Sequence, residues 1–136
     1  MTNQLSQIKW GRVILTALAV YVLSFLTIIL VVTAYASYLG FQARGAPDQT
    51  MITTFVDQYA PWVGSINLIV LTLLGAMWMV RRIDVALPLH GIILGVLVSI
   101  VSIVLDRTFG LDVLITTILT IGAGWFGSKL NIGRKN

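Results

Sequence analysis

The stretch "RRIDVALPLHGIILG", residues 81–95, contains the only histidine of the chain, His90. Arg81, Arg82 and Asp84 add charged groups to the same short region. Imidazole and guanidinium groups can hydrogen-bond a quinone or an anionic lipid head group, and a histidine can also ligate a haem iron. We predict a polar cluster near the membrane surface, in which Asp84 or a lipid phosphate holds the histidine. The first alternative is a site that binds a quinone or a lipid head group through His90, Arg81 and Arg82. The second alternative is a haem site in which His90 is the only protein ligand.

Asn67 is a polar residue in the predicted helix 62–80, about one helical turn below the outer surface. We expect it to hydrogen-bond a neighbouring helix, and in a second interpretation it lines a transport path together with hydroxyl groups. Proton-coupled transport needs an ionisable group inside the membrane, and the uncharged stretches contain none at mid-depth. The small multidrug exporters are of similar size, but the essential glutamate of their first helix has no counterpart here.

The composition places these residues in a membrane protein. The chain has 136 residues, of which 57% are hydrophobic and 10% are charged, and it contains no cysteine. Globular domains carry about 25% charged residues, so a soluble fold would lack polar surface. Without thiols, disulfides and thiolate metal sites are excluded. We expect one integral membrane domain over residues 1–136, with no cofactor, no metal site, no enzymatic activity and no nucleic-acid partner.

Long stretches without charge define the membrane-spanning segments. A spanning helix needs about 20 apolar residues, and four stretches are long enough. These uncharged stretches are residues 13–43, 58–80, 85–105 and 113–128. They predict an all-α bundle of four transmembrane helices, near 12–40, 62–80, 86–105 and 110–128. The sequence "AYAS" resembles a signal-peptide cleavage site, but the apolar run before it is about 20 residues, longer than the ~7–15 of a signal peptide. We therefore expect the first helix to be retained.

The charges between these segments predict the topology. Seven basic residues fall on one side of a four-pass thread: Lys9, Arg12, Arg81, Arg82, Lys129, Arg134 and Lys135. The other side holds two arginines and four aspartates. Because Lys and Arg favour the cytoplasmic side, we expect both termini in the cytoplasm and the chain in the plasma (inner) membrane.

The segment 41–61 is the only sizeable connection outside the predicted helices. Its apolar residues recur at helical spacing: Met51, Ile52, Phe55, Val56 and Tyr59. This pattern predicts a short amphipathic helix that lies on the outer interface or caps the bundle. The alternative interpretation is a docking surface for a partner.

Small residues follow matched spacings in the third and fourth segments. The third has Gly91, Gly95, Ser99 and Ser102, and the fourth has Thr116, Thr120, Gly124 and Gly127. If the chain turns near Phe109, the expected pairs are Gly91–Gly127, Gly95–Gly124, Ser99–Thr120 and Ser102–Thr116. Small residues let membrane helices approach closely, so we predict a close antiparallel hairpin. The alternative is that these stripes pack between protomers or against another subunit.

The stretch 81–95 also carries a resemblance. Basic residues after the second helix, followed by His-Gly and a glycine-rich third helix, resemble small four-helix integral membrane proteins of bacteria that have no established activity. The resemblance covers about half of the chain. It implies a four-helix membrane fold and says nothing about mechanism. From the residues we expect a non-catalytic subunit that acts by helix–helix contact in a larger membrane assembly. A small oligomeric transporter or channel, and a quinone- or head-group-binding protein that uses His90, are the alternatives.

Overall fold

The computed structural model describes residues 8–81, 83, 88–106 and 110–132. Four helices make up this part of the chain: α1 (Trp10–Ala43), α2 (Gln49–Arg81), α3 (Pro88–Asp106) and α4 (Leu111–Ile132). Each is long and apolar enough to cross a membrane. The prediction of an all-helical, multi-pass membrane protein is therefore confirmed.

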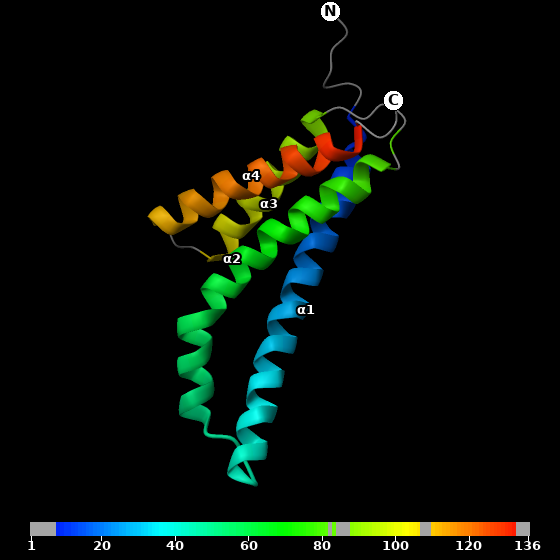
Figure 1. The fold of residues 1–136 in the computed structure, drawn as a ribbon. Coiled ribbons are helices and arrows are strands. Elements are labelled where there is room, and N and C mark those ends of the chain that lie inside the picture. Colours follow the sequence, from blue (N-terminus) through cyan, green and yellow to red (C-terminus); the bar gives the residue numbers. More distant parts are fainter. Residues whose placement is uncertain (1–7, 82, 84–87, 107–109, 133–136) are drawn as a thin grey trace, which may run out of the picture.

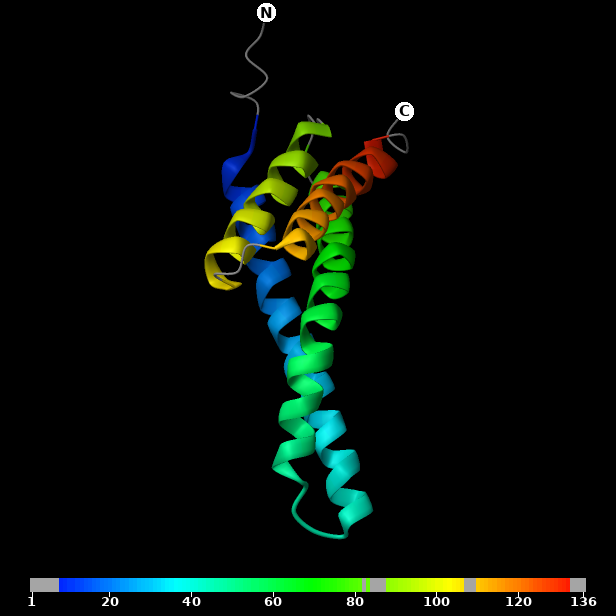
Figure 2. The same cartoon turned by 90° about the vertical axis from the view of Figure 1, so that its left-hand side faces the viewer.

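The first two helices are much longer than the last two. At 1.5 Å per residue, α1 with its 34 residues is about 51 Å long, whereas α3 with its 19 residues is about 29 Å long. Helices α1 and α2 form a long antiparallel hairpin, and α3 and α4 lie against the half that holds the start of α1 and the end of α2 (Figure 1). The other half of the α1–α2 hairpin extends beyond the α3–α4 pair (Figure 2).

The connection between α1 and α2 is shorter and more ordered than a 21-residue loop. Arg44 adopts the left-handed conformation, with φ 51°, and its N–H and that of Gly45 donate to carbonyls of the last turn of α1. This arrangement satisfies the free carbonyls at the end of a helix. Helix α2 then starts at Gln49, where the side chain of Asp48 accepts a hydrogen bond from the N–H of Thr50 at 2.8 Å.

The predicted separate amphipathic helix in segment 41–61 is not present, and this prediction was wrong in form. Its residues are helical, but they are the first part of α2, which continues through Pro61 without interruption. Proline removes one backbone hydrogen bond and bends a helix without ending it. The helix changes direction between its teal first part and its green remainder (Figure 1). The apolar stripe contacts α1, since Phe55 stacks on Tyr35.

The best-packed interior lies in the half of the molecule where all four helices meet. Its fully enclosed apolar side chains include Val13, Met79, Ile83, Leu94 and Val98. The hydroxyl of Tyr21 donates to the carbonyl of Val98 and so links α1 to α3. This packing fixes the position of α3 on the hairpin, and α3 in turn carries His90.

Candidate functional site

His90 lies in the first turn of α3, and none of its side chain is exposed. Its Nε2 accepts a hydrogen bond from the backbone N–H of Lys9 at 3.4 Å. Ile8 and Ile83, both buried, belong to the apolar cluster at this end of the bundle. The imidazole therefore ties the segment before α1 to α3.

Of the predicted polar cluster, the structure describes only Arg81 and His90. Arg81 ends α2 with its side chain exposed, on the surface of the protein, whereas His90 is enclosed. Arg82 and Asp84 lie outside the described residues. The sequence pattern gave no sign that the segment leading into α1 contacts the start of α3 at His90.

Asn67 joins α2 to α1. Its Nδ2 donates to the Oγ of Ser24 at 3.2 Å and lies 3.5 Å from the Ser24 carbonyl. The Ser24 side chain is buried. The expectation that Asn67 hydrogen-bonds a neighbouring helix is confirmed by this contact. Its amide is thereby engaged inside the protomer.

Glycines bring the backbones of α3 and α4 into direct contact. Gly91 and Gly124 face each other so closely that a Cβ on either would overlap the carbonyl of the other. A Cβ on Gly95 would lie 2.6 Å from the Cα of Ile121 and 2.9 Å from the Thr120 carbonyl oxygen. Only glycine fits at these positions without moving a helix.

The axial register of this pair differs from the predicted one by about one turn of α4. Gly91 meets Gly124, and not Gly127 as the turn near Phe109 implied. Gly127 instead lies against α2, where its Cβ would come within 2.5 Å of the Leu73 carbonyl oxygen. The prediction was wrong because α4 packs on two helices at once. Residues 124 and 127 lie about 60° apart around a helix, so they face different neighbours.

The two threonines of the predicted pairs across α3 and α4 donate their hydroxyl protons within their own helix. Thr120 donates to the Thr116 carbonyl at 2.7 Å, and Thr116 donates to the Asp112 carbonyl at 2.9 Å. A threonine in a helix can satisfy its hydroxyl on the preceding turn, and both do so here. Ser102 on α3 is half-buried. Within the described residues, the hydroxyl oxygens of Ser99 and Thr72 are buried without a hydrogen-bond partner.

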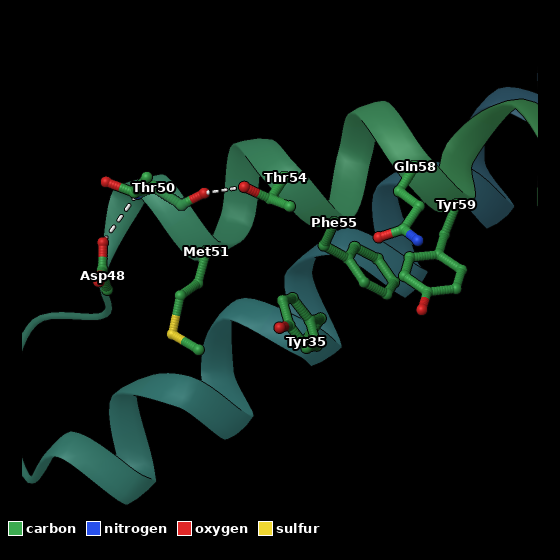
Figure 3. A pocket seen from close by; sticks show the side chains of 8 residues that line it. All are labelled: Tyr35, Asp48, Thr50, Met51, Thr54, Phe55, Gln58 and Tyr59. Carbon is green, nitrogen blue, oxygen red and sulfur yellow. Dashed lines mark hydrogen bonds between the residues drawn. The ribbon is translucent and has the colours of Figure 1, made fainter.

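A pocket of about 360 Å³ opens on the α1–α2 hairpin near the end that carries the connection. Its lining consists of Tyr35 from α1 together with Asp48, Thr50, Met51, Thr54, Phe55, Gln58 and Tyr59. The three aromatic rings lie together, with Tyr35 and Phe55 stacked at 4.1 Å and Phe55 and Tyr59 tilted at 5.2 Å between centroids. Figure 3 shows these rings towards one end of the pocket and Asp48 at the other.

The sequence reasoning missed this pocket. It assigned Phe55 and Tyr59 to a short helix that lies on the outer interface or caps the bundle. The connection between α1 and α2 is short, which brings the two apolar helix ends together, and the sequence prediction of a connection over residues 41–61 concealed this. Comparison with known proteins adds no assignment: no family model matches the chain, and no curated protein or solved structure matches it significantly.

Proposed function

We propose that this chain is a small, non-catalytic subunit of an integral membrane assembly and acts by helix–helix contact. The observation that supports this most is the unequal length of the two hairpins (Figures 1 and 2). Beyond the α3–α4 pair, α1 and α2 cover only each other, and they present large apolar side chains outwards. Large apolar side chains along α1 and α2 that are more than half exposed include Phe25, Leu30, Trp62 and Ile66. A partner helix could pack along this side of the hairpin over several turns.

The alternatives draw less support from the contacts. A transporter would use Asn67 along a path, but its amide bonds Ser24 within the protomer. A quinone or head-group site would use His90, but that side chain is enclosed. The pocket of about 360 Å³ lies on the extending hairpin and is lined by neither residue.

Partner contact can be tested directly. We would extract the tagged chain from its native membrane in mild detergent and determine the particle's mass and co-purifying chains. Other membrane chains in fixed stoichiometry support the proposal. A homogeneous particle of this chain alone overturns it, and flux assays on reconstituted protein would then test the transporter alternative.

The contact surface can be located with a photo-crosslinking residue placed at Leu30 or at Ile118. Both side chains are well exposed, at 68% and 61%, but Leu30 belongs to α1 and Ile118 to α4. We expect protein crosslinks from position 30 and only lipid adducts from position 118. Equal protein crosslinking at both positions would show that the α1–α2 hairpin has no special role in contact.

The proposed orientation places both termini in the cytoplasm of the cell whose plasma membrane holds the protein. The Lys129 amine lies 4.8 Å from the Trp125 ring near the end of α4, an arrangement that suits a cytoplasmic interface. Since the chain has no cysteine, single cysteines report topology cleanly. Gly11, near the start of α1, and Gln49, at the start of α2, are exposed at opposite ends of the hairpin. Each can be replaced by cysteine, as Gly11→Cys and Gln49→Cys. A membrane-impermeant maleimide should label position 49 but not position 11 in intact cells, and the reverse result would invert the topology.

A further inference from the structure

We propose that the pocket between α1 and α2 binds an organic ammonium group. Three features of the lining carry the proposal: a wall of aromatic rings, one carboxylate, and the lack of any basic side chain among the eight lining residues. A cation is attracted to the face of an aromatic ring and to a carboxylate, whereas an anion would find no positive partner here.

The aromatic wall is built by two helices. Tyr35 on α1 stacks on Phe55 of α2 at 4.1 Å with an angle of 16° between the ring planes. Tyr59, one turn further along α2, adds a third ring tilted by 31° to Phe55. The rings offer apolar surface to the methyl or methylene groups of a substituted ammonium ion, and their π systems favour its charge.

The carboxylate comes from the start of α2. Asp48 is exposed at the pocket and uses Oδ1 to accept the Thr50 N–H at 2.8 Å. This bond fixes the direction of the side chain, and a carboxylate has room for more than one partner. Figure 3 shows Met51 between Asp48 and the rings. The lining therefore presents a negative group at one end, apolar surface in the middle and aromatic rings at the other end.

The position of the pocket makes it accessible to two sources of such a ligand. Helices α3 and α4 need nearly their whole length to cross the ~30 Å hydrocarbon layer, so the half of the hairpin beyond them reaches the head-group region. Zwitterionic lipid head groups present ammonium ions at this level, and soluble substituted ammonium ions reach it from water. Both sources offer the same chemistry to the pocket, and a pocket of about 360 Å³ has the volume for either.

The test uses the purified full-length chain in an uncharged maltoside detergent, with tetraethylammonium chloride as the soluble probe. Saturation-transfer NMR would follow binding at constant ionic strength, maintained with sodium chloride. Asp48→Asn should weaken binding about fivefold, the effect of one unit charge at about 4 Å in water. Tyr35→Leu should weaken it about threefold. The matched controls are Asp57→Asn and Tyr38→Leu, which change exposed residues of the same hairpin that do not line the pocket.

A second arm tests the lipid source. Native mass spectrometry would compare retention of phosphatidylethanolamine with that of phosphatidylglycerol of the same acyl chains, on the unmodified chain and on Asp48→Asn and Asp57→Asn. Preferential retention of phosphatidylethanolamine that Asp48→Asn abolishes identifies a lipid head group as the ligand. Tetraethylammonium binding that depends on Asp48, without lipid discrimination, identifies a soluble ammonium ion. Equal behaviour of Asp48→Asn and Asp57→Asn in both arms, with unchanged unfolding temperatures, would overturn the proposal.

Discussion

Replacing Gly95 with alanine should separate α3 from α4, because the two backbones touch at this residue. The added Cβ would lie 2.6 Å from the Cα of Ile121, where ordinary contact starts at 3.4 Å, so the helices must move apart by about 0.8 Å. The obstacle is backbone, and no flexible side chain can move out of the way. Gly122 on α4 provides the matched control, since a Cβ there would meet nothing within 4 Å.

The expected magnitude follows from these two environments. Overpacking a tight contact costs about 1–3 kcal/mol, and glycine to alanine within a helix recovers up to about 1 kcal/mol in either variant. The difference between Gly95→Ala and Gly122→Ala therefore isolates the overpacking cost of about 1–3 kcal/mol. At roughly 4 °C per kcal/mol for a chain of this size, Gly95→Ala should unfold about 4–12 °C below Gly122→Ala.

Circular dichroism of both variants in the same detergent, at fixed detergent-to-protein ratio, would measure the two unfolding temperatures. Gly95→Leu extends the series and should unfold lower than Gly95→Ala, since a longer side chain demands a larger separation. Equal unfolding temperatures for Gly95→Ala and Gly122→Ala would refute the backbone contact, and with it the observed register of α3 on α4.

Three further substitutions test other contacts of the bundle. A double-mutant cycle with Ser24→Ala and Asn67→Ala should give a coupling of about 0.6 kcal/mol, and zero coupling would mean that the amide does not bond Ser24. His90→Ala should lower stability by about 2 kcal/mol and speed hydrogen exchange of the Lys9 amide, and unchanged exchange there would contradict the hydrogen bond that joins them. Arg44→Gly should raise stability by about 1 kcal/mol, because glycine adopts φ > 0 without the penalty of a Cβ. A loss of stability in Arg44→Gly would show instead that the arginine side chain contributes more than its backbone costs.

The sequence was sufficient to predict the four helices because a membrane-spanning helix needs a long stretch of apolar residues without charge. Charges such as Asp84, Asp106 and Asp112 end the apolar stretches, and the helices α3 and α4 begin or end within a few residues of them. The upstream end of α2 was missed because the rule detects only what lies in lipid. Residues 49–61 form regular helix beyond an internal proline, and their length depends on packing against α1.

The contacts between helices could be predicted only in part. The spacing of Gly91, Gly95 and Gly124 correctly indicated which faces of α3 and α4 meet, because helical periodicity assigns a residue to a face. Periodicity carries no information on the offset along the axis, and the register was therefore wrong by about one turn. The burial of His90 depends on residues 8 and 9, far away in sequence, and such long-range cover has no local pattern.

The two halves of the molecule place different demands on the sequence, and this supports the division of roles proposed for them. Where four helices meet, backbone contact at Gly91 and Gly124 and the enclosed His90 allow little change without loss of stability. On the extending hairpin, the ring contact of Tyr35 with Phe55 holds two helices that are otherwise open to their surroundings. Substitutions there should change what the protein binds more than how firmly it folds. Recognition of a partner or a ligand requires a variable surface on a rigid scaffold. The extending hairpin provides the surface, and the half where four helices meet provides the scaffold.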